Sequence, residues 1–184
     1  MLVISCHADT GFNSHALRRL EGGQVEGQLD NFAGVHAVML AYFSGRLTRG
    51  DIRIALTHGE ELGCLGAIEL LPALGEGDLV AVVDVTGSPT RKDFTVEKCG
   101  NARVEAFLRL ALGGLSYDLY RGCPDPVSDA DETDVYVEKC PFTFFLGLPV
   151  EGGDYNAGPV RCRLASIQAV AEAICRIAEQ FDRF

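Results

Sequence analysis

Short apolar runs alternate with longer segments of helical spacing along this chain. Residues 52–56 and 79–83 are rich in Val, Ile, Leu and Ala and bounded by Gly or Asp, which is typical of buried strands. Further strands are expected at 2–5, 116–120 and 142–146, and helices at 31–43, 64–74, 102–112 and 163–184. This alternation predicts an α/β fold, a three-layer α/β/α sandwich around a mixed, mostly parallel central sheet.

Length and charge exclude several classes of protein. The 184 residues suit one domain, so we expect residues 1–184 to form a single catalytic-type unit. With 16 Lys+Arg against 26 Asp+Glu, the net charge of −10 argues against a nucleic-acid binder. No stretch approaches the roughly 20 apolar residues of a membrane span, and the first residues lack the basic start of a signal peptide.

The seven cysteines indicate a compartment rather than a disulfide framework. Their number is odd and no two have Cys-x-x-Cys spacing. Thiols used in this way are typical of a reducing environment, so we expect a cytoplasmic protein.

Acidic residues and a histidine fall where predicted strands end. His7 follows the first strand with Asp9 close behind, the pair Glu60 and Glu61 follows 52–56, and Asp84 ends 79–83. Parallel strands end at one edge of a sheet, so we expect these groups, with Asp30 before the first helix, to converge there.

Each residue also has an ordinary structural interpretation. Asp30 could cap a helix, Glu60 and Glu61 could favour the positive start of the next helix, and a lone histidine is usually structural. Taken together, the set has a joint chemical explanation. Zinc prefers imidazole and carboxylate ligands, one carboxylate can bridge two ions, and a free carboxylate can act as general base.

The ordered motifs resemble those of the co-catalytic zinc exopeptidases, which include aminopeptidases, carboxypeptidases and amide deacylases. The matching segments are His7-Ala-Asp9-Thr, Leu29-Asp30-Asn31-Phe-Ala-Gly34, Thr57-His-Gly-Glu60-Glu61-Leu-Gly63, Val83-Asp84-Val-Thr86 and Ser128-Asp129. The resemblance implies the phosphorylase/hydrolase-like fold of that superfamily and a site holding one or two zinc ions, with cobalt or manganese as substitutes.

The same resemblance implies a role for each residue. His7 and Asp84 would bind the first metal, Asp30 would bridge both metals, and Glu61 would bind the second. Glu60 would be the general base that activates water, and Asp9 would orient His7.

The resemblance breaks near the end of the chain. The family closes its second site with a histidine, but Asn156 stands at the matching position and no histidine follows His58. An amide oxygen is a poor zinc ligand, so the second site of Asp30, Glu61 and Asn156 is expected to be weakened. Asp154 is an alternative ligand. The chain also has too few residues for the lid or dimerisation insert of many relatives, so short loops or a partner chain of a homo-oligomer would supply the substrate contacts.

Other patterns favour structural roles. A thiol nucleophile at Cys6 or Cys64 lacks an orienting third group. The acidic stretch 129–134 lacks the Gly and Glu of a calcium loop and is interpreted as a solvated loop. Arg161 and Arg163 could bind a substrate carboxylate, but we expect them to flank the last helix.

The sequence thus predicts a metal-dependent, aminopeptidase-like hydrolase of small peptides or N-acylated amino acids. The alternative is a metal-binding or interaction module that keeps the peptidase fold with little catalysis.

Overall fold

Nine strands form one mixed sheet within residues 1–13 and 16–184, the part of the chain that the computed structural model describes. The strands are β1 (Leu2–His7), β2 (Arg18–Leu20), β3 (Gln24–Gly27), β4 (Ile52–Thr57), β5 (Leu79–Thr86), β6 (Phe94–Glu97), β7 (Tyr117–Leu119), β8 (Phe142–Glu151) and β9 (Val160–Arg163). Their order is β2-β3-β9-β8-β5-β1-β4, and β6 joins β8 to β7.

The centre of the sheet is parallel and its margins are antiparallel. Strands β4, β1, β5 and β8 pair in parallel register. On its other side β8 pairs antiparallel first with β6 and then with β9, and β9 continues antiparallel into the β2–β3 hairpin. The prediction of a mixed, mostly parallel sheet is therefore confirmed.

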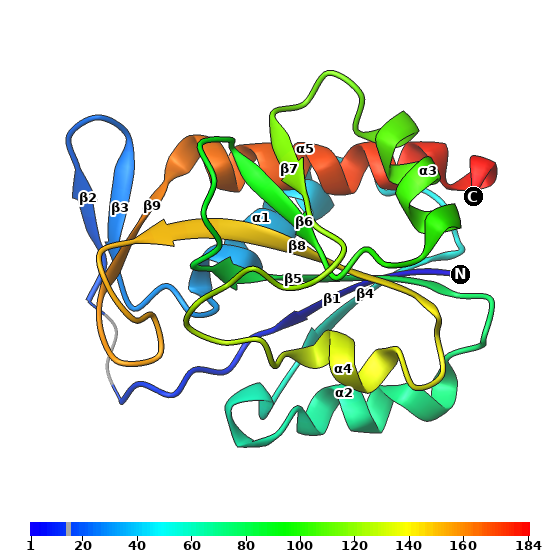
Figure 1. Cartoon of the computed structure of the whole chain (residues 1–184), viewed down its shortest axis with the longest axis horizontal. Coiled ribbons are helices and arrows are strands. Elements are labelled where there is room, and N and C mark those ends of the chain that lie inside the picture. The colour runs from blue at the N-terminus through cyan, green and yellow to red at the C-terminus, as the bar shows by residue number, and fades with distance from the viewer. Residues whose placement is uncertain (14–15) are drawn as a thin grey trace.

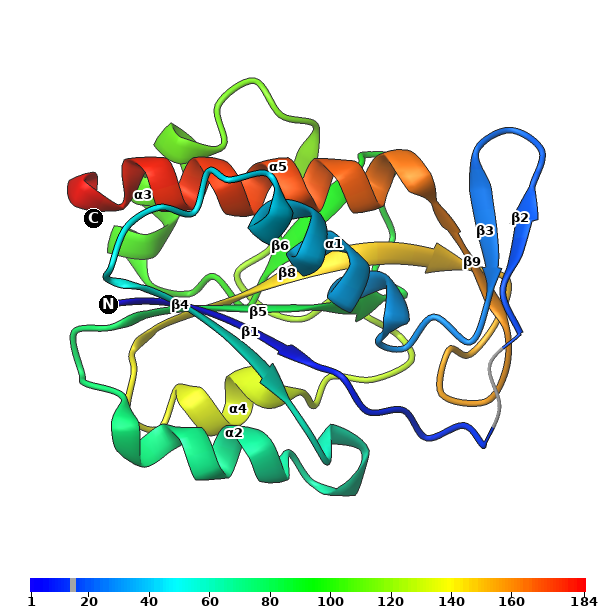
Figure 2. The ribbon, with the colours of Figure 1, turned by 180° about the vertical axis from the view of Figure 1, so that it is seen from behind.

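Helices cover both faces of this sheet, as Figures 1 and 2 show. Helices α1 (Phe32–Phe43), α3 (Ala102–Ala111) and α5 (Leu164–Gln180) lie on one face, and α2 (Leu65–Leu70) and α4 (Glu132–Tyr136) lie on the other. Three 3-10 turns, η1 (Glu60–Leu62), η2 (Leu71–Ala73) and η3 (Phe181–Arg183), complete the described elements. The predicted three-layer sandwich is thus present.

Two apolar cores lie on the two faces of the sheet. In β1, Leu2, Ile4 and Cys6 are buried against the α1 and α5 side, whereas Val3 joins the smaller cluster under α2 and α4. Successive residues of a strand face opposite ways, so a strand covered on both faces is apolar throughout. No helix in the described ranges is long and apolar enough to cross a bilayer.

Three expected helices have different ends. The helix predicted at 64–74 is α2, which stops at Leu70 and gives way to a 3-10 turn at Pro72, because proline cannot continue the hydrogen-bond ladder. The predicted last helix ends at Gln180 and is also followed by a 3-10 turn. The first helix begins at Phe32, and its cap is Asn31 rather than Asp30.

The interpretation of 129–134 as a solvated loop was wrong for residues 132–134, although residues 129 and 130 are exposed and lie in a loop. Residues 132–136 form α4, which begins with a capping box between Asp131 and Asp134. Glu132 is completely buried, and its carboxylate accepts a hydrogen bond from Ser5 Oγ at 2.7 Å. A dense run of acidic residues suggested exposure, but one member of the run packs under the sheet beside a polar residue of β1.

Candidate metal centre

Three residues from different parts of the chain meet at the carboxyl end of the central strands. His7 ends β1, Asp84 lies near the end of β5, and Asp30 lies just before α1. His7 Nε2 lies 3.1 Å from Asp30 Oδ1 and 3.1 Å from Asp84 Oδ2. All three side chains are buried, and their ligand atoms lie within 4.8 Å of one another.

The contacts inside this group, here called the trio, are not hydrogen bonds. His7 Nε2 and Asp30 Oδ1 have no hydrogen-bond partner despite their short separation. Buried polar atoms are normally hydrogen bonded, so such orphans require an explanation. Ligand atoms that surround one cation at about 2.0–2.2 Å would lie at comparable separations without bonding to each other. The donor set of one imidazole and two carboxylates therefore fits a zinc-like ion.

Asn31 fastens Asp30 to the strands. Its side-chain amide donates to Val83 O at 2.8 Å and to Cys6 Sγ at 3.3 Å, while its Oδ1 accepts from Gly34 N at 3.0 Å. A Cβ on Gly34 would lie 2.1 Å from Asn31 Oδ1. Glycine at 34 is therefore needed for Asn31 to cap α1 and to hold the preceding residue beside β1 and β5.

Asp9 connects the trio to the glutamate pair. Its Oδ1 lies 3.4 Å from His7 Nδ1 and accepts a hydrogen bond of 3.3 Å from the backbone N–H of Glu60. Asp9 thus lies beside the imidazole, although His7 Nδ1 has no hydrogen-bond partner. Asp9 also ties the start of η1 to the end of β1.

Burial and neighbouring charges shift the pKa values of His7, Asp84, Glu60 and Glu61. Burial opposes protonation of His7, but the charge of Asp84 and the close polar contacts with Asp30 and Asp84 outweigh it and raise the pKa of His7 to about 12. Burial raises the pKa of Asp84, with Asp30 adding to the effect against His7. For Glu60, burial raises the pKa to about 7, which His7 partly opposes. Burial also raises the pKa of Glu61. A bound cation would relieve this concentration of negative charge.

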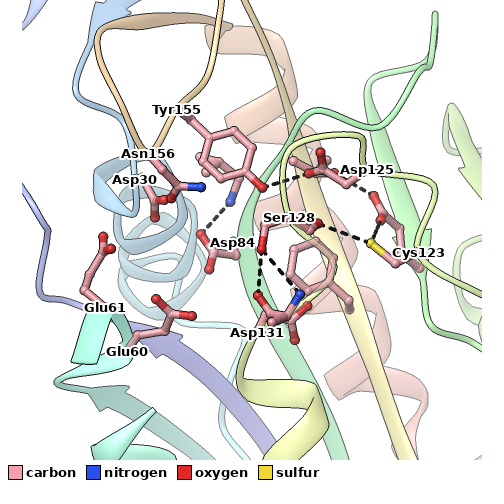
Figure 3. A pocket seen from close by; sticks show the side chains of 15 residues that line it. Asp30, Glu60, Glu61, Asp84, Cys123, Asp125, Ser128, Asp131, Tyr155 and Asn156 are labelled. Carbon is pink, nitrogen blue, oxygen red and sulfur yellow. Dashed lines mark hydrogen bonds between the residues drawn. The ribbon is translucent and has the colours of Figure 1, made fainter. Parts of the chain in front are cut away.

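The trio opens onto an acidic cavity of about 230 Å³. Figure 3 shows the side chains of Asp30, Glu60, Glu61 and Asp84 pointing toward a common space, with Asp125 and Cys123 on its far side. The other lining residues include Thr86, Glu97, Ser128, Asp131, Tyr155 and Asn156, and no lysine or arginine of the described residues lines it.

The far side of the cavity is a hydrogen-bonded cluster, here called the Glu97–Asp125 cluster. Glu97 Oε1 accepts from Thr95 Oγ1 at 2.6 Å and lies 3.0 Å from the Thr86 hydroxyl. Asp125 Oδ2 accepts from Gly87 N at 2.7 Å and from Tyr155 OH at 2.9 Å. Burial raises the pKa of Glu97, against the opposing effect of its hydroxyl donors.

A glycine in β8 makes room for this cluster. A Cβ at Gly147 would lie 2.3 Å from Thr95 Oγ1, 2.6 Å from Thr86 Cγ2 and 2.9 Å from Glu97 Oε1. The position lies within the part of β8 that pairs with β6. Because residue 147 is glycine, the side chains of Thr95 and Glu97 can lie closer to the β8 backbone than they could beside any residue with a Cβ atom.

The second predicted metal site is not assembled in the same way. Glu61 is exposed and its Oε1 accepts from Gly11 N at 3.0 Å. Asn156 lines the same cavity, and Glu61 is not part of the close ligand group. Asp154 Oδ1 accepts from the backbone N–H of Asn156 at 2.9 Å, which uses that carboxylate within its own turn.

The remaining candidates lie elsewhere. His58 is exposed and lies 3.2 Å from Glu69. Ser128 lines the acidic cavity, whereas Asp129 lines a neighbouring one. Arg163 is the residue before α5, as expected, and Arg161 lies in β9. All seven cysteines are free thiols.

The sequence interpretation missed Glu97, Asp125 and Tyr155. The signal for Glu97 was weak: it ends the β-prone run at 94–97, but this strand runs antiparallel to β8, so the rule for parallel strands does not place it. The sequence offered no comparable signal for Asp125, which lies in a loop, or for Tyr155, which lies in the connection from β8 to β9.

The sequence matches no protein-family model and no curated protein. Its structure is similar to those of aminopeptidases. It matches a TET aminopeptidase from the marine sediment archaeon Thaumarchaeota archaeon SCGC AB-539-E09 with a TM-score of 0.74 at 12% identity, over 92% of this chain and 55% of that one. An aminopeptidase from Desulfurococcus kamchatkensis gives 0.71 at 14% identity, over 90% and 51%. An M18-family aminopeptidase from Thermotoga maritima gives 0.67 at 15% identity, over 89% and 48%.

These matches confirm that the chain has the fold of the aminopeptidase structures, as the resemblance implied. The chain spans about half the length of the structures it matches. At such low identity the similarity establishes architecture, and the chemistry has to be argued from the site itself.

Proposed function

We propose that this chain is a metal-dependent hydrolase of peptide or N-acyl amide bonds with an aminopeptidase-like site. The observation that carries the proposal is the trio. Its buried ligand atoms converge without hydrogen bonds beside a cavity lined by carboxylates. Similarity to aminopeptidase structures supports the same reaction class.

In this proposal His7, Asp30 and Asp84 hold one divalent ion, zinc in the first instance, with cobalt or manganese as substitutes. Such an ion would supply Lewis acidity, polarising a carbonyl group and lowering the pKa of water. Any second ion would rely on Asp30, Glu61 and Asn156, and would bind more weakly because an amide replaces imidazole.

Glu60 is proposed as the general base. Its side chain lines the cavity, and its pKa of about 7 is suited to accepting a proton near neutral pH. Asp9 is proposed as a positioning residue, because its Oδ1 lies 3.4 Å from His7 Nδ1 and a hydrogen bond between them would fix the direction of Nε2.

The substrate class follows from the charge of the cavity. A small peptide with a free amino group, or an N-acylated amino acid, would bring its scissile carbonyl to the trio. The carboxylates that line the cavity favour the positively charged amine of a peptide.

The free thiols support a cytoplasmic location. The exposed Tyr42 and Phe43 of α1 support self-association, and one similar structure is a dodecamer.

The test is hydrolysis of aminoacyl and N-acetylated substrates in the presence of zinc, cobalt or manganese. Glu60→Gln is expected to lower kcat by about 10²–10⁴-fold while metal content stays the same. Glu76→Gln is the matched control, because Glu76 is exposed near the opposite end of β5. An unchanged rate in Glu60→Gln, or no hydrolysis of any substrate with metal bound, contradicts the proposal.

The second candidate function is a metal-binding module with little catalysis. It is favoured by Asn156 in place of a histidine and by the distance of Glu61 from the trio. Metal analysis separates the two: one bound ion per chain without turnover would support the module. Asn156→His is expected to add a second ion at matched free zinc. Unchanged metal content would show that position 156 is not the missing ligand.

A further inference from the structure

A second cavity, of about 210 Å³, lies on the exposed face of β9 and is lined by four cationic side chains. Arg161 and Arg163 belong to β9, whereas Arg91 and Lys92 belong to the segment between β5 and β6. We propose that this cavity binds an oxyanion, either the carboxylate of a peptide or free phosphate.

The strand geometry places the two arginines together. Val160 and Cys162 of β9 are buried, so the alternate residues Arg161 and Arg163 project from the other face. Gln24 of β3 is the register partner of Arg163 and lines the same cavity. Two guanidinium groups two residues apart on one strand face can present parallel N–H donors to one planar anion.

The loop cations are held against this strand. Arg163 donates a hydrogen bond to the backbone carbonyl of Lys92, and its guanidinium lies 3.3 Å from Asp93. Both contacts join β9 to the segment that carries Arg91. The cavity is therefore built by two parts of the chain that the fold fastens together, rather than by neighbouring residues on one flexible loop.

Three of the four cations in this cavity have no carboxylate partner among the described residues, although the chain is acidic. The chain has 26 Asp+Glu, and arginines such as Arg46 and Arg49 each contact two carboxylates. In the described residues, no carboxylate lies within 4.0 Å of Arg91, Lys92 or Arg161. Glu151 lines the cavity and Asp93 is taken by Arg163, so the local balance is positive.

The position of the cavity relates it to the acidic one. Glu151 of β8 is the register partner of Arg161, and the connection that follows carries Tyr155 and Asn156 into the acidic cavity. At Gly152 a Cβ would lie 3.5 Å from Arg161 Nε, so the arginine passes close to the base of this connection. The β8–β9 hairpin, drawn in Figure 1, thus carries Arg161 and Arg163 near its base, and its connection lines the cavity onto which the trio opens.

The test is calorimetric titration of the full chain at low ionic strength, where exposed charges are least screened. Inorganic phosphate is the first probe. An N-acetylated dipeptide with a free carboxyl group is the second, and its C-terminal amide is the third. Arg161→Ala is expected to weaken oxyanion binding about tenfold or more, because a charge-assisted bidentate contact is lost.

Arg53→Ala is the matched control, because Arg53 is an exposed cation of β4 at the other edge of the sheet. It should leave the affinity within about twofold. Arg91→Ala provides a second variant if Arg161→Ala fails to fold, and unchanged circular dichroism is the criterion for folding. Phosphate binding that is unchanged in both Arg161→Ala and Arg91→Ala would place the anion elsewhere, for example at a metal ion beside the trio, and would overturn the proposal.

Saturable binding of phosphate alone, lost in Arg161→Ala, would assign the site to free phosphate. Preference for the dipeptide acid over its amide, lost in the same variant, would assign it to peptide carboxylates. No saturable binding by either probe, or equal weakening in Arg161→Ala and Arg53→Ala, overturns the proposal. These outcomes do not depend on hydrolysis, so they remain separate from failure of the proposed function.

Discussion

The two sides of the acidic cavity treat buried carboxylates in opposite ways. In the trio, His7 Nε2 and Asp30 Oδ1 face each other at 3.1 Å and neither has a hydrogen-bond partner. In the Glu97–Asp125 cluster, hydroxyl and backbone N–H groups donate to the carboxylates of Glu97 and Asp125. Figure 3 shows both sides of this cavity.

The difference teaches what each side is suited to do. A carboxylate whose oxygens already accept several hydrogen bonds is stable without a cation, and it can give a cavity shape and charge. Atoms that converge without bonding are costly unless something else fills the space between them. The trio is thus the side of the cavity suited to bind an ion. The Glu97–Asp125 cluster, here also called the wall, already has its hydrogen-bond partners within the protein.

The largest effect is expected from breaking the trio. Asp84→Asn should lower zinc affinity by more than about 100-fold, because altering even an outer partner of a ligand costs 10–100-fold. Isothermal titration with zinc measures the change. Glu97→Gln is the matched control on the other side of the cavity and should bind zinc as the parent does. Equal losses in both variants would show that the two sides do not differ.

A smaller effect is expected from breaking the wall. Gly147→Ala should lower the free energy of unfolding by about 1–3 kcal/mol, because the new methyl group overlaps Thr95 and Thr86. Urea unfolding of the metal-free protein measures it. Gly50→Ala, where nothing lies within 4 Å of the added carbon, should change the free energy of unfolding by less than about 0.5 kcal/mol. Similar losses in both variants would refute the close packing at Gly147.

The smallest effect is a pH dependence specific to the wall. Burial raises the pKa of Glu97 above its ordinary value, and hydrogen bonds from Thr95, Ser88 and Thr86 oppose the rise. Between the ordinary pKa and the raised one, the folded state binds more protons than the unfolded state. Stability therefore falls as pH rises through this window.

Glu97→Gln removes this proton and should flatten that decline relative to the parent. The measurement is the free energy of unfolding of both proteins in the absence of metal, from pH 4 upward. The difference between the two curves isolates Glu97 from the other acidic groups of the cavity. Parallel curves would mean that Glu97 stays ionised throughout the range.

The trio could be predicted because one simple rule applies to it. His7 and Asp84 stand at the ends of apolar runs, and parallel strands end at one edge, so their proximity follows once the sheet is inferred. Asp30 was predicted from its place before a helix. The sequence could not give the local detail that Asn31, rather than Asp30, caps α1.

The wall could not be predicted for a related reason. Glu97 ends a strand of four residues that runs antiparallel to β8, so the rule for parallel strands does not place it. Asp125 lies in a loop whose path depends on contacts with Gly87 and Tyr155. The convergence of the cations at 91, 92, 161 and 163 could not be predicted either, because it depends on how β9 pairs with its neighbours.

Composition also misled the interpretation at α4. The run of acidic residues at 129–134 suggested a solvated loop, yet Glu132 is buried against Ser5, 127 residues away in the sequence. Local charge density gives no information about a long-range partner. A buried carboxyl group in such a run becomes evident only when the sheet and its covering helix are placed.

The way β8 changes partners has a consequence for how this site can be altered. Its last residues, Val150 and Glu151, pair with β9, and the connection that contains Asn156 joins these two short paired segments. The trio stands instead on β1, β5 and the segment before α1. A protein engineer can therefore treat residues 152–159 as a replaceable cassette and graft connections of other lengths or with a histidine. The ligands of the trio lie outside the cassette and keep their own supports in each graft.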